Sequence, residues 1–217
     1  MKKHIIKALA ALALLAAATA CSKFEKVPGD PMDSRIYTLK NGLKVFMTVN
    51  REEPRIQTLI AVRVGGKDDP SETTGLAHYL EHLMFKGTPE YGTQDYEAEK
   101  PYLDEIEAMY EQYRTITDPA ARKVFYSKID SVSQIASQIA IPNEYDKMMS
   151  MIGARGTNAW TSNDQTVYTE DIPSNQIENW ARVQAGRFKN MVIRGFHTEL
   201  EAVYEEYNRG LTSDSNK

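Results

Sequence analysis

The sequence predicts an α+β protein in which helices pack on a β-sheet. Asn41-Gly42, a pair typical of a type I′ hairpin turn, separates two short apolar stretches within residues 35–49. Residues 56–64 carry apolar or β-branched side chains at every second position, which is the period of a strand. Residues 94–141 instead contain long stretches with the composition of helices. Strands and helices are therefore both expected in this chain.

The helical region divides at Asp118-Pro119, where aspartate can cap a helix and proline can take its first position. We therefore expect an αα-hairpin over residues 94–141, with an arm or the edge of a lid as its expected role. The segment that follows it, residues 158–169, is expected to form a strand.

The composition is that of an ordinary soluble protein with a hydrophobic core. The chain has 217 residues, enough for one or two domains, with 41% hydrophobic and 26% charged residues. Its net charge is −4, and removing the three lysines among the first 20 residues gives −4 − 3 = −7. Proteins that bind nucleic acid present a basic face. We therefore expect no nucleic-acid partner.

The first 20 residues have the pattern of an export signal. Three lysines (Lys2, Lys3 and Lys7) precede an apolar run over residues 8–18, which is shorter than the roughly 20 residues that span a bilayer. Ala18-Thr19-Ala20-Cys21 resembles a bacterial lipobox, so Cys21 is the expected lipidation site. The alternative is an ordinary signal peptide cleaved near Ala20, with Cys21 a free thiol. We expect a lipoprotein of the outer membrane or periplasm of a Gram-negative bacterium, tethered by residues 21–34.

His78-Tyr79-Leu80-Glu81-His82 is the strongest chemical signal in the sequence. In a helix, residues at positions i, i+3 and i+4 share one face, so His78, Glu81 and His82 would point the same way. Two imidazoles can bind a metal ion, and a carboxylate beside them can act as a base. The alternative is a pair of surface histidines next to an acid. Three preceding hydroxyl residues could cap this helix: Ser71, Thr73 and Thr74.

A catalytic zinc site needs a third protein ligand and an open position for water. Cys21 is the only cysteine, so thiolate sites are excluded and histidine or a carboxylate must complete the set. Thr198-x-x-Glu201 has the pattern of a capping box and predicts the start of a last helix there. The candidates near this helix are His197, Glu199, Glu201, Glu205 and Glu206.

Three motifs together resemble the insulinase/pitrilysin family of metallopeptidases, the inverzincins. The order H-x-x-E-H inverts the H-E-x-x-H of the common zinc proteases, and Gly75–Thr88 is similar to the zinc helix of this family. Gly156–Pro173 resembles its substrate-binding strand, and Glu199–Arg209 resembles the helix with its third ligand. The resemblance runs from about Ile36 to the end of the chain.

The resemblance implies one zinc ion per chain, with Glu206 as third ligand beside the two histidines. It implies that Glu81 is the general base and that Glu199 holds a ligand histidine in place. It also implies that an extended peptide pairs with the strand edge at Asn158 and Ala159. The alternative for Asn158 is an interior strand, in which it serves only the turn after Gly156.

The family has repeated α+β domains that close around the substrate, and this chain ends soon after the third-ligand helix. We therefore expect residues 35–217 to be an incomplete N-terminal peptidase domain, with residues 94–141 as an insertion, and a partner subunit or a missing C-terminal half. The expected activity is zinc-dependent cleavage of peptides or small unfolded proteins. A peptide-binding or assembly subunit without catalysis is the alternative.

Overall fold

The computed structural model describes residues 24–212, and the chain divides into two units at Pro54–Arg55. Each unit is described by itself. The expected export signal and Cys21 lie outside the described residues. No helix within residues 24–212 is long and apolar enough to cross a membrane.

The first unit contains a three-stranded antiparallel sheet of β1 (Glu25–Lys26), β2 (Arg35–Thr38) and β3 (Lys44–Met47), in that order. The predicted hairpin at Asn41-Gly42 is confirmed, but its turn is not type I′. Of Asn41 and Gly42, only Gly42 has a positive φ (88°), whereas a type I′ turn needs a positive φ at both central residues. The Gly42 amide donates to the Leu39 carbonyl (2.9 Å), which closes a turn with glycine at its left-handed end.

The second unit is built on the antiparallel sheet β4-β6-β5, made of β4 (Arg55–Val62), β6 (Thr166–Pro173) and β5 (Arg155–Thr161). The single strand expected over residues 158–169 is wrong, because residues 162–165 form a turn that divides it into two strands. The Ser162 amide donates to the Gln165 carbonyl (2.8 Å) in this turn. Within the described sheet, β5 is therefore an edge strand.

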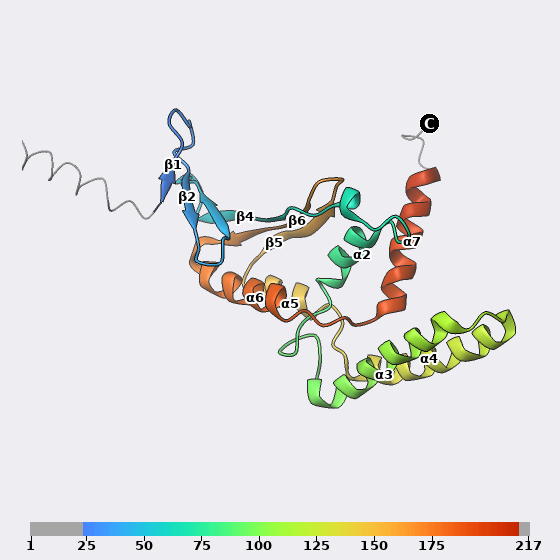
Figure 1. The fold of residues 1–217 in the computed structure, drawn as a ribbon. Helices are drawn as coiled ribbons and strands as arrows, with labels where there is room; N and C mark the ends of the chain where they lie inside the picture. The colour runs from blue at the N-terminus through green and yellow to red at the C-terminus, as the bar shows by residue number, and fades with distance from the viewer. Residues whose placement is uncertain (1–23, 213–217) are drawn as a thin grey trace, which may run out of the picture. The chain divides into compact units, whose positions relative to one another are not determined.

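Within residues 55–212, six α-helices surround the sheet or extend away from it (Figure 1). They are α2 (Leu76–Leu83), α3 (Tyr96–Thr115), α4 (Pro119–Ile139), α5 (Glu144–Met151), α6 (Ile177–Lys189) and α7 (Phe196–Thr212). Two short 3₁₀ helices lie at Gly66–Asp68 and Ser174–Gln176. Helices α2, α5 and α6 contact the sheet, whereas α7 lies beside α2.

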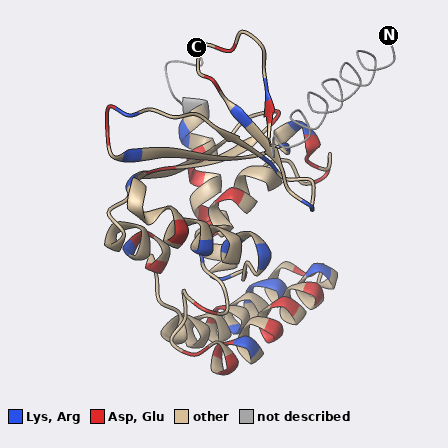
Figure 2. Ribbon diagram, turned by 90° about the vertical axis from the view of Figure 1, so that its left-hand side faces the viewer, with Lys and Arg blue, Asp and Glu red and all other residues tan. Residues whose placement is uncertain are grey.

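The predicted αα-hairpin is confirmed as α3 and α4, which pack against each other and contain acidic and basic residues along their length (Figure 2). Both helices begin at an aspartate. The Asp95 side chain accepts from the Ala98 amide (3.1 Å), and the Asp118 side chain accepts from the Ala121 amide (2.7 Å). Pro119 occupies the first turn of α4, as the sequence predicts.

The start of α7 differs from the prediction. The helix begins at Phe196, directly after Gly195 (φ 61°), and the Glu199 amide donates to the Gly195 carbonyl (3.0 Å). Thr198 therefore lies inside the first turn, and the predicted capping box at Thr198 and Glu201 is wrong. The earlier start places α7 directly after the segment that contains Arg194.

Candidate metal centre

Helix α2 places His78, Glu81 and His82 on one face, and its first turn is capped by Asp69. One Asp69 oxygen accepts from the Gly75 amide (2.7 Å) and the other from the Ala77 amide (2.8 Å). An acidic cap also suits the positive end of the helix dipole. The prediction that Ser71, Thr73 or Thr74 caps this helix is therefore wrong: Gly75 is at the cap position, with φ 94° and no side chain.

Helices α2 and α7 are held together by a small hydrophobic cluster of Tyr79, Leu83 and Val203, all at most 8% exposed. The Tyr79 hydroxyl donates to the Phe196 carbonyl (2.6 Å), so a polar bond joins α2 to the first residue of α7. Burial raises the pKa of Tyr79, which keeps the phenol protonated as a donor. This packing brings α7 alongside the histidine face of α2.

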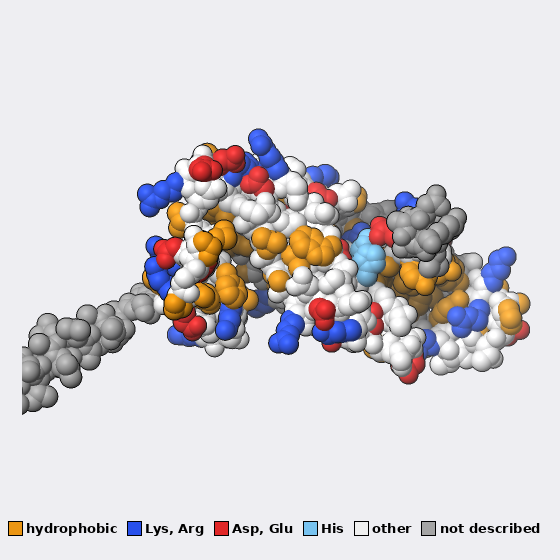
Figure 3. Space-filling model, turned by 90° about the horizontal axis from the view of Figure 1, so that it is seen from above, with side chains coloured by type: hydrophobic (Ala, Val, Ile, Leu, Met, Phe, Trp, Pro, Cys, Tyr) orange, Lys and Arg blue, Asp and Glu red, His pale blue; other side chains and the backbone are white. Residues whose placement is uncertain are grey.

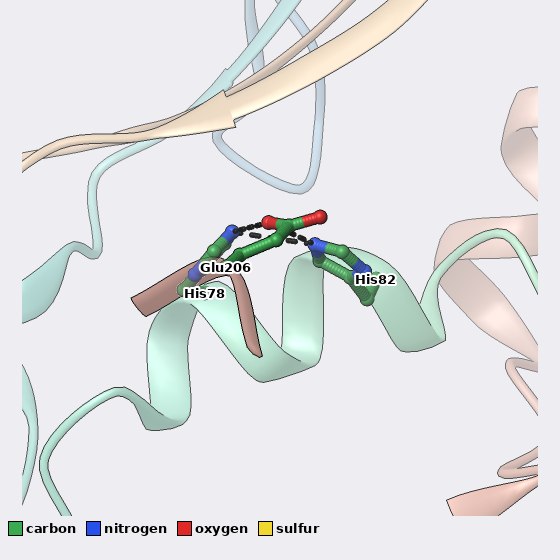
Figure 4. Close-up of side chains that lie close together, drawn as sticks. All are labelled: His78, His82 and Glu206. Carbon is green, nitrogen blue, oxygen red and sulfur yellow. Dashed lines mark hydrogen bonds and ion pairs between the residues drawn. The ribbon is translucent and has the colours of Figure 1, made fainter. Parts of the chain in front are cut away.

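His78, His82 and Glu206 converge on one point (Figure 4). The two histidine Nε2 atoms are 3.2 Å apart, and Glu206 Oε2 lies 3.5 Å from His78 Nε2 and 3.6 Å from His82 Nε2. Ligand atoms about 2.0–2.2 Å from a tetrahedral zinc lie roughly 3.3–3.6 Å from one another. The three atoms therefore have the chemistry and the spacing of a zinc site with one position left open.

Glu199 orients the second of these histidines. Its Oε1 lies 2.9 Å from His82 Nδ1, and its Oε2 pairs with the Lys86 ammonium. Burial alone would raise the pKa of Glu199, but the hydrogen bonds from Lys86 and His82 outweigh it and lower the pKa below its ordinary value. An ionised Glu199 accepts a hydrogen bond from the Nδ1–H of His82, which keeps the proton on Nδ1 and leaves the Nε2 lone pair directed at the site.

Glu81 lies beside this group and is only 6% exposed. The Thr161 hydroxyl at the end of β5 donates to Glu81 Oε2 (2.5 Å), which fixes the orientation of the carboxylate. Glu81 and the three converging residues line a cavity of about 540 Å³. Histidine and acidic side chains lie next to each other on the face shown in Figure 3, and the His78 and Glu206 side chains are 37% and 46% exposed, so the site is open to solvent.

Residues 157–161 of β5 form another wall of this cavity. Asn158 pairs with Thr169 of β6 and Ala159 with Tyr168, so the ladder occupies one side of β5. The other side of the strand borders the cavity in the described structure. Asn158 therefore does not lie in an interior strand here, and an extended peptide has an edge on which to add.

The structure does not bring His197 to the metal group. Its ring packs on Tyr110 of α3, with 4.3 Å between the ring centroids, and burial lowers its pKa. Two other candidate carboxylates, Glu201 and Glu205, are also outside the group. Sequence reasoning missed Lys86, although it follows His82 by four residues, and missed Thr161, whose only signal was its place in the strand motif.

Comparison with known protein families finds a match to the model described as Insulinase (Peptidase family M16), over residues 44–117. An insulin-degrading enzyme homolog of Dictyostelium discoideum is 28% identical over 105 residues, which are 48% of this chain and 10% of the relative. Protease 3 of Escherichia coli is 29% identical over 127 residues, or 54% of this chain and 13% of the relative.

Two solved structures share the fold. The crystal structure of pitrilysin aligns with a TM-score of 0.56 at 17% identity, and covers 90% of this chain and 16% of pitrilysin. A protease from Helicobacter pylori aligns with a TM-score of 0.53 at 22% identity, and covers 80% of this chain and 30% of that protein. The matched region is thus a small part of the length of each relative.

Proposed function

Because the chain carries a domain of the insulinase family (peptidase family M16), whose members include proteases, we propose that it is a zinc-dependent metallopeptidase. The substrates we propose are peptides and small unfolded proteins. One observation carries the proposal: three zinc-type ligand atoms lie 3.2–3.6 Å apart, in a cavity that also holds a buried carboxylate and an open strand edge.

His78, His82 and Glu206 would hold the zinc ion, which when bound polarises the scissile carbonyl and lowers the pKa of water. Glu81 takes a proton from the attacking water and later gives it to the leaving amine. The hydrogen bond from Thr161 fixes one oxygen of Glu81, so the other can serve in proton transfer. Glu199 keeps His82 in the tautomer that binds metal.

The substrate is proposed to bind as an added strand on the edge of β5. Main-chain hydrogen bonds at Asn158 and Ala159 would hold an extended peptide without much dependence on its sequence. Such binding places a peptide bond next to Glu81, because Thr161 of the same strand is bonded to that residue. Folded proteins would be poor substrates, since their strands are already paired.

The first test is the zinc content of the full chain and of a Glu206→Gln variant, measured by elemental analysis. We expect about one zinc ion per wild-type chain and a clear loss in the variant. A folded wild-type chain with no zinc, or a variant that retains all of it, would contradict the metal site. Peptide cleavage is measured next, with the Glu81→Gln variant as the control that keeps the metal ligands.

A peptide-binding subunit without catalysis is the second candidate, because the open edge of β5 can bind a peptide without any zinc chemistry. It predicts peptide binding that is equal in wild type and Glu81→Gln, with no cleavage by either. A C-terminal half or a partner subunit is also proposed to complete the site. Cleavage activity that appears only with a longer gene product or an added partner would support this.

We also propose that Cys21 carries lipid and anchors the protein to the outer membrane. The apolar run over residues 8–18 and the Ala18-Thr19-Ala20-Cys21 sequence support this. Two or more acyl chains anchor stably where one does not. Metabolic labelling with a radioactive fatty acid, compared between wild type and Cys21→Ala, tests the proposal, and an unlabelled wild type would refute it.

A further inference from the structure

We propose that the α3–α4 hairpin positions the third metal-binding residue, Glu206, through a buried ion pair between Glu99 and Arg194. The inference rests on the metal centre of the proposed function, and it assigns to the hairpin a task beyond that of an arm. Arg194 and Glu99 are positioning residues: they act on the site through the placement of α7.

The ion pair is buried, and both oxygens of Glu99 share the one Nε–H group of Arg194. Arg194 Nε lies 2.8 Å and 2.9 Å from the two oxygens of Glu99, and the side chains are 5% and 1% exposed. Burying two charges is costly unless the geometry is good and the remaining donors are satisfied. Glu99 lies in the first turn of α3, and Arg194 lies two residues before α7.

The remaining donors of Arg194 bind the loop that leaves α2. Nη2 donates to the Thr88 carbonyl (2.9 Å), and Nη1 lies 3.2 Å from the Lys86 carbonyl. The loop closes around the guanidinium: a Cβ atom at Gly87 or Gly92 would lie 3.0 Å from Nη1, and both glycines have positive φ. One side chain thus joins three segments: the base of the hairpin, the loop after the histidine helix, and the approach to α7.

These contacts set the direction of the α7 axis at its first turn. Val192 donates its amide to the Gly87 carbonyl (3.1 Å), and Lys86 of the same loop pairs with Glu199 in the first turn of α7. The hairpin also contacts this turn through aromatic rings. The ring centroid of Tyr110 in α3 lies 5.3 Å from that of Phe196 and 4.3 Å from that of His197. The base of α7 is therefore held from the hairpin side by both an ion pair and an aromatic contact.

Farther along α7, three large apolar side chains are exposed. Leu200, Tyr204 and Tyr207 are 48%, 65% and 62% exposed, and only Val203 is buried against α2 among these apolar residues. Glu206 lies 12 residues beyond Arg194, or roughly 18 Å along a helix. A tilt of about 5° at the base would therefore move Glu206 by roughly 1.5 Å, far more than the tolerance of about 0.2 Å in a metal site.

The experiment measures zinc affinity of the full chain, with zinc ion alone in competition with a chromophoric chelator. We expect Arg194→Gln to weaken zinc binding roughly 10- to 100-fold, as loss of a residue that orients a ligand does. The matched control is Arg55→Gln, which breaks another arginine–carboxylate pair, Arg55–Asp171 at 2.8 Å. This pair lies at the end of the sheet opposite to Thr161 and the metal group. That control should bind zinc with wild-type affinity.

A double-mutant cycle separates positioning from general loss of stability. If Arg194 acts through Glu206, adding Arg194→Gln to Glu206→Gln should change zinc affinity by no more than about twofold. If the two effects multiply in full, the inference is wrong. Should Arg194→Gln fail to fold by circular dichroism, Glu99→Gln replaces it in the same cycle, because it keeps the side-chain shape and the bonds from Arg194 to the loop.

The outcomes distinguish this inference from the proposed function. A wild-type chain that binds no zinc would overturn both. A wild type that binds zinc, with binding weakened by Glu206→Gln but unchanged in Arg194→Gln and Glu99→Gln, would overturn the inference alone and leave the metal site standing.

Discussion

Replacing Glu199 with glutamine tests how the protein sets the proton on His82. The carboxylate bonds His82 Nδ1 with one oxygen (2.9 Å) and the Lys86 ammonium with the other. Glutamine has the same shape but only one accepting oxygen. With that oxygen toward His82, its amide group faces the Lys86 ammonium, and two donors oppose each other. With the oxygen toward Lys86, the amide donates to Nδ1 and forces the proton onto Nε2, which then cannot bind zinc.

The first orientation should prevail, because Lys86 is 31% exposed in its side chain and can turn toward solvent. A charge-assisted hydrogen bond to His82 is then replaced by a neutral one, which is about half as strong. We expect zinc affinity to fall about tenfold, or about 1.4 kcal/mol. The assay is competition with a chromophoric chelator at neutral pH.

A second variant checks the reason for this loss. Lys86→Met removes the opposing donor, so Glu199→Gln should cost less zinc affinity in the Lys86→Met background than in wild type. Equal or tighter zinc binding in Glu199→Gln alone would refute the reasoning, since it would show that the charge on Glu199 does not matter for His82.

Three further predictions concern Glu81, Tyr79 and His197. Glu81→Gln should keep zinc but lower peptide turnover by about 10²-fold or more, whereas His82→Ala should lose both zinc and turnover. Elemental analysis and a cleavage assay on the same samples check this, and a Glu81→Gln variant with wild-type turnover would contradict the role of Glu81. Tyr79→Phe removes the hydrogen bond to the Phe196 carbonyl, an oxygen that also accepts a hydrogen bond within α7. The free energy of unfolding should therefore fall by only about 1 kcal/mol, and the melting temperature by roughly 2–4 °C. An unchanged melting curve would show that this hydrogen bond contributes nothing to stability. Burial lowers the pKa of His197 from its ordinary 6.5, with Glu201 acting in the opposite direction. Below pH 6.5 the unfolded chain therefore binds more protons than the folded chain, and the free energy of unfolding should fall as the pH drops. Denaturant unfolding measured from about pH 8 to 5 should show a shallower fall in His197→Phe than in wild type.

The histidine helix could be predicted from the sequence because its geometry is local. His78, Glu81 and His82 share a face through helical spacing alone, and no distant contact is needed to place them. Glu206 is different, since several carboxylates occur within a few residues of it. The sequence analysis selected Glu206 among them only through the resemblance to a family. In the structure, the position of Glu206 depends on the packing of Tyr79 and Val203 between α2 and α7.

The errors in prediction also have identifiable causes. The capping box at Thr198 was overridden by Gly195, whose left-handed conformation starts α7 earlier. The cap of α2 comes from Asp69, six residues before Gly75, which is farther than local capping rules reach. The turn after Thr161 was missed because Ser162 and its neighbours were read as part of one strand motif. In each case a contact beyond the local pattern decided the outcome.

The Glu99–Arg194 pair had no sequence signal at all. Its two residues lie 95 positions apart. Glu99 stands among other charged residues of α3, a pattern typical of a solvated face, and Arg194 stands alone between Ile193 and Gly195. Only the burial of both side chains reveals that this acid differs from its neighbours on α3. Charged residues on a helix surface are usually solvated, so a sequence pattern alone favours the wrong reading here.

The open edge of β5 also affects the behaviour of the protein in solution. An unpaired strand can serve as a template for a strand from any chain, including a second copy of the same protein. Self-association through this edge and peptide binding would compete for the same main-chain groups. A short extended peptide in excess should therefore reduce light scattering in concentrated samples, and an inhibitor that occupies this edge should act as a solubilising additive.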